Sequence, residues 1–283
     1  MELSSPLCHN SVPFVTDRRS DRLVPCDVIL KIKVISSANG AGERHQYLLS
    51  YVCNQSVAID AGCIGMITPL EEQLRIKHVF LSHSHLDHTA SLPQFLDNVY
   101  FPGPDCPNIY AHPATLESLR SDFFNERVWP DLERLSRDES PFLRLFPLLE
   151  SQATTVDGLT ITPIDLLHVV PTFAYTVSDG SSTVAIVSDT SPSERIWEVL
   201  NALPRLDALF LEVSFPNSMQ WVADKAMHLT PQTFGEELAK LQRRVRTLAV
   251  HVKPAFRAKV LQEVAELNLP QVEFADPGRE YVF

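Results

Sequence analysis

Apolar and polar residues alternate along much of this chain in patterns that predict an α/β protein rich in short strands. Between residues 26 and 35 every second side chain is apolar, which is the period of a strand with one buried face. Two further strand-like runs follow at 46–53 and 55–59, after a turn signal at 39–42. The chain is therefore predicted to open as an antiparallel meander, preceded by a loose polar leader over residues 1–25.

The rest of the chain alternates continuous apolar runs, typical of buried strands, with amphipathic segments that predict helices. Expected strands cover 78–81, 108–111, 159–164, 173–177, 183–187, 208–213, 247–250, 272–274 and 281–283. Expected helices cover 68–74, with Thr68 as N-cap and Pro69 at the first position, 89–98, 192–200, 230–243, opened by Thr230 and Pro231, and 254–267. Residues 97–150 are expected to form a mostly helical cap insert beside the active site.

Composition narrows the class of protein. A chain of 283 residues with 45% hydrophobic residues suits one large domain. Its formal net charge of -11 disfavours nucleic acid and anionic membranes as partners. The five cysteines lack a C-x-x-C pair, and no apolar run reaches the roughly 20 residues that span a bilayer. We expect a soluble cytoplasmic protein without a cleaved signal.

The strongest chemical signal is the segment Ser-His-Ser-His-Leu-Asp-His at 82–88, which follows the apolar run Val-Phe-Leu. If the chain is extended there, His83 and His85 point the same way, because side chains alternate along a strand. Asp87 and His88 then lie where the chain turns into a helix. One strand end can therefore provide ligands for two adjacent cations. Imidazole and carboxylate together suit zinc, manganese or iron better than calcium or magnesium.

Three more polar residues, His168, Asp189 and His251, each follow an apolar run that predicts a strand. Strand ends are where a sheet can gather ligands from distant parts of a chain. Taken one at a time, each of these residues is more typical of a cap or a surface position than of a ligand.

The order H-x-H-x-D-H, His, Asp, His, together with Asp60–Gly62 after an earlier strand, resembles the metallo-β-lactamase superfamily. The resemblance implies a four-layer αββα sandwich of two mixed sheets over residues 26–283. It also implies two divalent metal ions, most readily zinc, with manganese or iron as alternatives. The implied ligands are His83, His85 and His168 on one ion, Asp87, His88 and His251 on the other, and Asp189 bridging the two.

Five later segments, in the order in which they occur, resemble the class II cyclic-nucleotide phosphodiesterases. They are Phe-Ala-Tyr at 173–175, Ser-Asp-Thr-Ser-Pro at 188–192, Leu-Glu-Val-Ser-Phe-Pro-Asn at 211–217, His-Leu-Thr-Pro at 228–231 and His-Val-Lys-Pro at 251–254. The resemblance implies hydrolysis of 3′,5′-cyclic nucleotides (cAMP or cGMP) to 5′-monophosphates by a metal-activated hydroxide. Two departures are Ser188 and Ser191, where the family usually has glycine, and the insert at 97–150, which matches no pattern.

The catalytic candidates are His228, Glu212 and Asp87. His228 precedes a predicted helix N-terminus and could protonate the leaving 3′ oxygen, with Glu212 fixing its tautomer. His228 could instead be a ligand in place of His251, or a capping residue, and Glu212 could be a buried structural carboxylate. Lys253 is a phosphate contact or, more typically, a surface lysine.

Competing functions remain open on the sequence. A nuclease like the tRNA 3′-processing enzymes would use the same ligands but needs a basic surface. Residues 97–150 hold five arginines, no lysine and ten acidic residues, so that segment is negative. A non-catalytic nucleotide-binding module would be expected to lack some ligands.

The oligomeric state, a homodimer included, is not determined by the sequence. His9, His45, His78 and His112 are assigned to structure or surface, and Cys63 to a small buried thiol.

Overall fold

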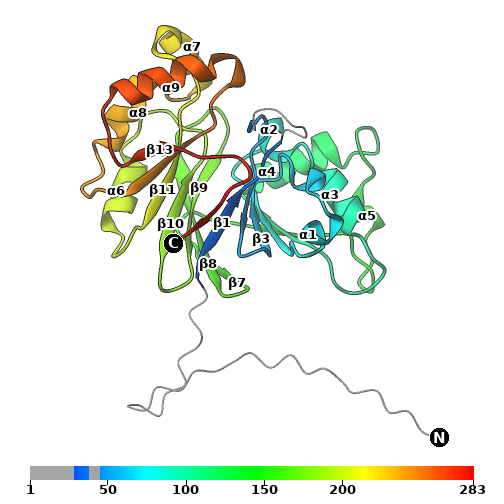
Figure 1. Cartoon of the computed structure of the whole chain (residues 1–283). Coiled ribbons are helices and arrows are strands. Elements are labelled where there is room, and N and C mark those ends of the chain that lie inside the picture. The colour runs from blue at the N-terminus through cyan, green and yellow to red at the C-terminus, as the bar shows by residue number, and fades with distance from the viewer. Residues whose placement is uncertain (1–28, 38–44) are drawn as a thin grey trace, which may run out of the picture.

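The computed structural model describes residues 29–37 and 45–283. In this part of the chain two seven-stranded mixed sheets pack against each other, with helices on both outer faces (Figure 1). The predicted four-layer αββα sandwich is therefore confirmed. The predicted leader, the turn at 39–42 and the start of the first predicted strand lie outside the described residues.

The first sheet has the strand order β14-β1-β2-β3-β4-β5-β6. Its strands are β1 (Lys31–Val34), β2 (Tyr51–Cys53), β3 (Val57–Ile59), β4 (His78–Phe80), β5 (Asn108–Ala111), β6 (Arg144–Pro147) and β14 (Glu280–Val282). Pairing is antiparallel from β14 to β3 and parallel from β3 to β6.

The second sheet has the order β13-β12-β11-β10-β9-β8-β7. Its strands are β7 (Thr154–Val156), β8 (Leu159–Leu166), β9 (Thr172–Ser178), β10 (Thr183–Val187), β11 (Ala208–Glu212), β12 (Arg246–Val250) and β13 (Val272–Phe274). It too has an antiparallel part, β7 to β10, and a parallel part, β10 to β13. The carboxyl ends of β10, β11 and β12 therefore meet at the same edge.

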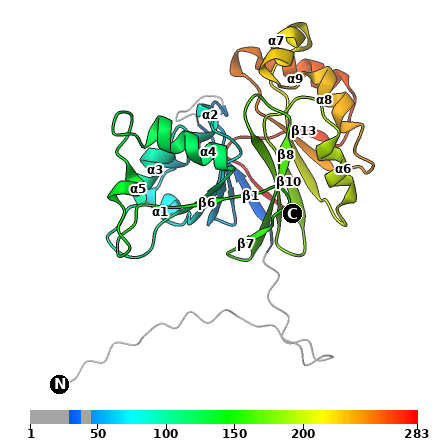
Figure 2. The ribbon, with the colours of Figure 1, turned by 180° about the vertical axis from the view of Figure 1, so that it is seen from behind.

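Helices cover the two sheets separately, as the view from behind shows (Figure 2). The first sheet carries η1 (Ile64–Met66), α1 (Leu70–Leu74), α2 (Leu86–Thr89), α3 (Leu92–Val99), α4 (Pro113–Ser118), the π-helical turn η2 (Leu119–Phe123) and α5 (Leu132–Leu135). The second carries α6 (Arg195–Ala202), η3 (Asn217–Met219), α7 (Gln220–Ala226), α8 (Pro231–Leu238), η4 (Pro254–Phe256) and α9 (Arg257–Glu266). Among the described residues, none of these helices has the length and apolar character needed to cross a bilayer.

Three apolar clusters fill the spaces between the four layers. The central cluster joins the sheets and includes aromatic contacts such as Tyr51 with Phe210, whose ring centroids are 5.5 Å apart. The second cluster lies under the helices of the first sheet, and the third under those of the second. Burial of apolar side chains on both faces explains why these strands read as continuous apolar runs in the sequence.

Several local predictions were wrong in detail. Pro69, not Thr68, occupies the N-cap position of α1, and no side chain caps that helix. The helix predicted at 89–98 is divided into α2 and α3 at Ser91, whose hydroxyl donates to Ala61 O and accepts from Gly65 N. Strands β6 and β7 and helix α7 were missed. Thr230 caps α8 as predicted, but the helix ends at Leu238, not near residue 243.

The segment 97–150 is more closely joined to the first sheet than a separate cap would be. It supplies strands β5 and β6 as well as helices α4 and α5. Its residues Leu116 and Phe123 lie in the same apolar cluster as Phe95 of α3. The prediction of a mostly helical insert therefore missed the edge strand β6, whose sequence, Arg-Leu-Phe-Pro, is short and exposed.

The glycine at position 62, after Asp60 and Ala61, is required by the close approach of two backbone segments. The Ala61 amide donates to His88 O, and the Leu49 amide donates to Asp87 O, so this loop lies directly against α2. A Cβ atom on Gly62 would lie 2.1 Å from Asp87 O and 2.7 Å from Leu49 N. Backbone packing of the metal-motif segment thus requires a residue without a side chain here.

We expect Gly62→Ala to lower the free energy of unfolding by at least about 1–3 kcal/mol, because the clash is with backbone that cannot move aside. Gly235→Ala is the matched control, since its Cβ would meet flexible Leu267 side-chain atoms at 3.3 Å and alanine favours the helix. Urea unfolding of both variants checks this. Equal stabilities for the two variants would contradict it.

Candidate metal centre

Seven ligand-type side chains from distant parts of the chain converge at one edge of the sandwich. The motif at 82–88 follows β4 and enters α2, which lies at the junction of the two halves (Figure 1). His168 follows β8, Asp189 follows β10, and His251 follows β12. All of the residues predicted as ligands are thus brought together.

These side chains form two overlapping groups whose ligand atoms lie within 4.8 Å of one another. The groups are His83, His85, His168 and Asp189, and Asp87, His88, Asp189 and His251. A third group shares His251 and adds the two catalytic candidates, Glu212 and His228. Asp189 belongs to both of the first two groups.

The carboxylate of Asp189 faces the two groups with different oxygen atoms. Its Oδ2 lies 3.6 Å from His83 Nε2 and 3.9 Å from His168 Nε2. Its Oδ1 lies 3.3 Å from His88 Nε2 and 3.4 Å from His251 Nε2. This is the arrangement that a carboxylate needs in order to bridge two cations.

The chemistry of the site fits metal ions. Within the described residues, His83 Nε2, His88 Nε2 and Asp189 Oδ1 are buried and have no hydrogen-bond partner. Leaving a buried polar atom unpaired costs about 1–3 kcal/mol, so three such atoms aimed at one another are not explained by packing. Divalent ions held by imidazole nitrogens and carboxylate oxygens would satisfy all three.

Burial and charge set the protonation states that metal binding needs. Burial lowers the pKa of His83, His85 and His168, which favours the neutral, ligating form. Burial alone would raise the pKa of Asp189, but the His251 and His88 imidazoles outweigh it and hold the pKa well below its usual range. Asp189 is therefore a carboxylate anion.

His88 behaves differently because it lies between two carboxylates. Burial lowers its pKa, but Asp189 and Asp60 together raise the pKa well above its usual value. A cation is therefore favoured beside this imidazole, whether it is a proton on the ring or a metal ion at Nε2. The carboxylates that attract the proton are the ones that would stabilise the metal.

In the first half of the chain, Asp60 and Ser82 contact the Nδ1 atoms of the ligand-type residues His83 and His88, on the side of each ring that faces away from Asp189. Asp60 Oδ2 accepts from His88 Nδ1 at 2.7 Å and from Ser82 Oγ at 2.9 Å. Ser82 Oγ lies 2.9 Å from His83 Nδ1. Because the Nδ1 atoms are engaged in this way, the Nε2 atoms of both imidazoles are free to face Asp189.

In the second half of the chain, Glu212 and Ser214 contact the Nδ1 atoms of His228 and His251 in the same way. Glu212 is fully buried, and its Oε1 accepts from His228 Nδ1 at 2.8 Å. Burial lowers the pKa of His228, but Glu212 outweighs it, so that the pKa is raised overall. His228 Nε2 points toward the site and lies 3.9 Å from Asp189 Oδ2.

The sequence analysis assigned no role to Ser82, Ser214 or Asp60. Each lies within a quoted motif, but a serine or an aspartate that supports a ligand has no spacing of its own. A hydroxyl one residue before the first histidine of the motif was the available signal for Ser82. Cys63 is buried as expected, and burial raises its pKa to about 11.

The open side of the site is marked by Asp87 and Lys253, whose side chains are 28% and 33% exposed. Lys253 Nζ lies 3.3 Å from Asp87 Oδ2, so this lysine lies at the site rather than on a remote surface. These two partly exposed side chains lie on the side of the site that solvent reaches.

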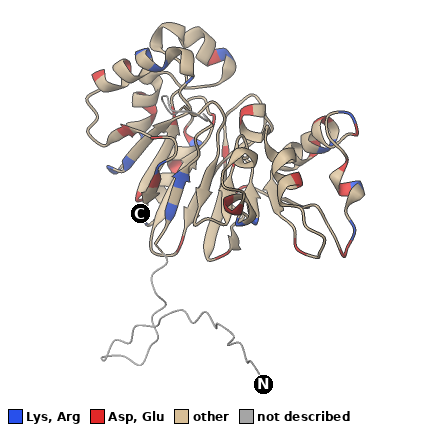
Figure 3. Ribbon diagram, turned by 45° about the vertical axis from the view of Figure 1, so that its right-hand side comes forward, with Lys and Arg blue, Asp and Glu red and all other residues tan. Residues whose placement is uncertain are grey.

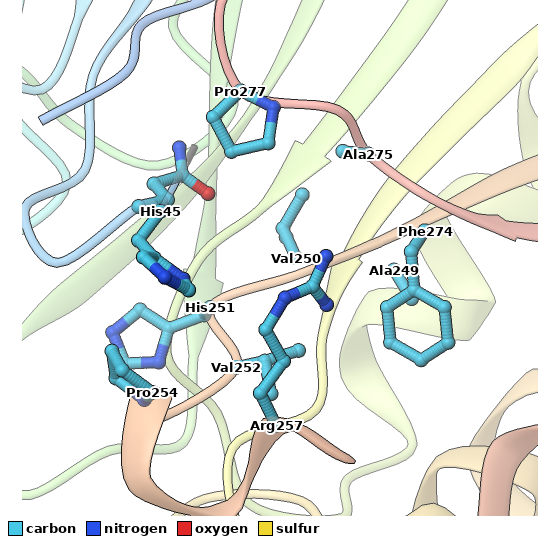
Figure 4. A pocket seen from close by; sticks show the side chains of 11 residues that line it. His45, Ala249, Val250, His251, Val252, Pro254, Arg257, Phe274, Ala275 and Pro277 are labelled. Atoms are coloured by element: carbon cyan, nitrogen blue, oxygen red, sulfur yellow. The ribbon is translucent and has the colours of Figure 1, made fainter. Parts of the chain in front are cut away.

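A small pocket lies behind His251, beside the site. His45, His251 and Arg257 line it together (Figure 4). His45, assigned from the sequence to structure or surface, therefore lies close to a ligand. The pocket holds about 30 Å³, room for one or two water molecules, whereas small-molecule sites typically hold about 300–1,000 Å³. This pocket is therefore too small for a small-molecule ligand.

A four-layer sandwich with this cluster of histidines and aspartates at its edge defines a metallo-β-lactamase-fold hydrolase, a class that binds divalent metal ions. The sequence profile of the beta-lactamase superfamily domain matches residues 65–252. The chain belongs to that superfamily.

Curated relatives are cyclic-nucleotide phosphodiesterases. A probable 3′,5′-cyclic-nucleotide phosphodiesterase of Yersinia pestis is 27% identical over 250 residues, which cover 77% of this chain and 70% of the relative. The 3′,5′-cyclic-nucleotide phosphodiesterase of Aliivibrio fischeri is 29% identical over 196 residues, which cover 59% of this chain and 54% of the relative. The chain thus spans about half of that second enzyme.

Solved structures share the fold at lower identity. Unliganded yeast PDE1 superposes with a TM-score of 0.71 and 19% identity, covering 90% of this chain and 99% of that chain. The short form of human tRNase Z superposes with a TM-score of 0.61 and 17% identity, covering 89% of this chain and 98% of that one.

We expect Asp189→Ala to bind less than half as much metal as the wild-type protein, because this side chain faces both groups of ligands. Asp207→Asn, which alters a carboxylate paired with Arg205 away from the site, is the control and should retain full metal content. Elemental analysis after dialysis against zinc measures both. Full occupancy in Asp189→Ala would contradict the bridging arrangement.

Proposed function

We propose that this protein is a binuclear metal-dependent phosphodiesterase that hydrolyses 3′,5′-cyclic nucleotides to 5′-nucleoside monophosphates. The observation that carries the proposal is the division of the Asp189 carboxylate between two sets of buried imidazoles. The names of the curated relatives support the choice of substrate.

The proposal assigns a ligand set to each ion. His83, His85 and His168 hold one ion, Asp87, His88 and His251 hold the other, and Asp189 bridges them. Zinc suits this donor set, and manganese or iron are alternatives. When bound, two such ions lower the pKa of water to near neutrality and offset negative charge on a phosphodiester.

His228 is assigned as the proton donor to the leaving 3′ oxygen. Its Nδ1 is engaged by Glu212, so Nε2 is the atom left to face the substrate, and the raised pKa keeps a proton available. The alternative role, a metal ligand in place of His251, would use the same Nε2 atom, so the metal content of a His228 variant decides between the two. Glu212 fixes the tautomer of the His228 ring. Asp87 is a metal ligand that lies on the open side of the site, next to Lys253. Lys253 can approach a phosphate oxygen there.

Charge disfavours the nuclease alternative. Acidic and basic residues are interspersed along the helices of both halves (Figure 3), and the segment 97–150 holds twice as many acidic residues as arginines. A tRNA body would meet no large basic surface there, while a small cyclic nucleotide is held mainly by the ions and Lys253.

An activity panel tests the proposed function. The zinc- and manganese-loaded protein should hydrolyse cAMP or cGMP faster than 2′,3′-cyclic nucleotides, bis-p-nitrophenyl phosphate or a tRNA precursor, and chelation should abolish the reaction. Product analysis should show 5′-monophosphates, since the bond to the 3′ oxygen breaks. Preferred cleavage of the tRNA precursor would reject the assignment in favour of a nuclease.

His228→Ala should keep its metal and lose about 10²–10⁴-fold in rate, the typical contribution of a positioned proton donor. The control is His78→Ala, at the far end of β4, which should keep its activity. Metal analysis and steady-state rates measured side by side separate the two roles. Loss of metal from His228→Ala would make this residue a ligand.

A further inference from the structure

We propose that Ser214 is a positioning residue that fastens the ligand His251 to the same buried carboxylate that holds His228. Glu212 would then set the geometry of one metal ion and of the proton donor together. The inference rests on the two-ion part of the proposed function and is independent of which substrate the enzyme uses.

Ser214 is fully buried at the centre of this network. Its Oγ lies 2.8 Å from Glu212 Oε2 and 2.7 Å from His251 Nδ1. The other carboxylate oxygen, Oε1, accepts from His228 Nδ1 at 2.8 Å. One carboxylate therefore holds one imidazole directly and a second imidazole through the serine hydroxyl.

The direction of each hydrogen bond follows from the chemistry of the groups. Two oxygen atoms that can only accept face the Ser214 hydroxyl, Glu212 Oε2 at 2.8 Å and His251 O at 3.1 Å, and its single proton goes to the nearer, carboxylate oxygen. The serine oxygen is then left to accept from Nδ1–H of His251. This places the lone pair of His251 on Nε2, the atom that faces Asp189 Oδ1 at 3.4 Å.

His251 has particular need of such support. Its backbone φ is +62°, in the left-handed region that residues with a side chain rarely adopt, so its conformation depends on support from its neighbours. Ser214 Oγ also lies 3.1 Å from His251 O, and Ser214 O accepts from Lys253 N. The serine thus contacts both the ring and the backbone of the residue that it positions.

The first half of the chain contains the same kind of arrangement. Asp60 holds His88 directly at 2.7 Å and reaches His83 through Ser82, whose Oγ lies 2.9 Å from each partner. A carboxylate, a serine and two imidazoles thus occur twice, once behind each half of the site. In both halves the serine hydroxyl lies between a buried carboxylate and an imidazole, a position that filling space does not require.

Removing the hydroxyl should affect the two ions unequally. Ser214→Ala leaves His228 on Glu212 but frees His251, which belongs to the ligand set of Asp87 and His88. Loss of such supporting partners typically weakens metal binding by 10–100-fold. We expect that loss for one ion only, with the other ion bound as in the wild-type protein.

The experiment is a chelator competition on the fully loaded proteins, with manganese electron paramagnetic resonance to tell a coupled pair of ions from a single ion. Ser214→Ala should lose the second ion at 10–100-fold lower chelator concentration and show the single-ion signal. Ser214→Thr keeps a hydroxyl and should recover most of the affinity. Thr247→Val is the control, a buried β12 hydroxyl that bonds Val245 O and touches no ligand.

Each other outcome overturns the inference. Unchanged affinity of both ions in Ser214→Ala rejects it while leaving the two-ion site intact. Equal weakening of both ions, or failure of threonine to rescue a folded protein, indicates a merely structural serine. A wild-type protein that binds one ion rejects the two-ion assignment and this inference with it, whereas absence of cyclic-nucleotide hydrolysis affects only the proposed substrate.

Discussion

The structure depends on one buried carboxylate surrounded by imidazoles. Asp189 is 1% exposed, and both of its oxygens face histidine Nε2 atoms contributed by the other half of the chain and by the ends of two other strands of its own sheet, β8 and β12. An isolated anion in such a place would be very unfavourable, because burial removes its hydration. The site is stable only if positive charge lies next to this anion. Both its geometry and its residue types therefore imply bound cations.

Rigid backbone holds the groups that surround this anion. The motif loop lies against Gly62 with no room for a Cβ, and His251 is held in a left-handed backbone conformation by its neighbours. Behind the ligands, two carboxylates and two serines fix the imidazole rings. Residues of this supporting layer are as buried as the hydrophobic core, so the site forms part of the packing between the two halves rather than an addition to its surface.

Two similar halves account for the position of the site. Each sheet joins an antiparallel part to a parallel part, and the ends of β4, β10, β11 and β12 meet where the sheets adjoin. Each half therefore contributes ligands to the same small volume, and neither half contains a complete set. A phosphodiester bound on the open side would be reached by groups from both halves, among them Lys253 and Asp87.

The sequence by itself determined most strands and the ligand-type cluster at 82–88, because buried strands and clustered histidines leave strong local patterns. The four-layer sandwich and the roles of His168, Asp189 and His251 were predicted only through the resemblance to a family. The sequence did not determine the division of the 89–98 helix, the edge strand β6 or the roles of Ser82 and Ser214. Those depend on contacts between segments far apart in the chain, such as Ser91 with Ala61 and Ser214 with His251. A serine hydroxyl is compatible with any surface or turn, and only the tertiary structure, by placing it between a buried carboxylate and an imidazole, gives it a function.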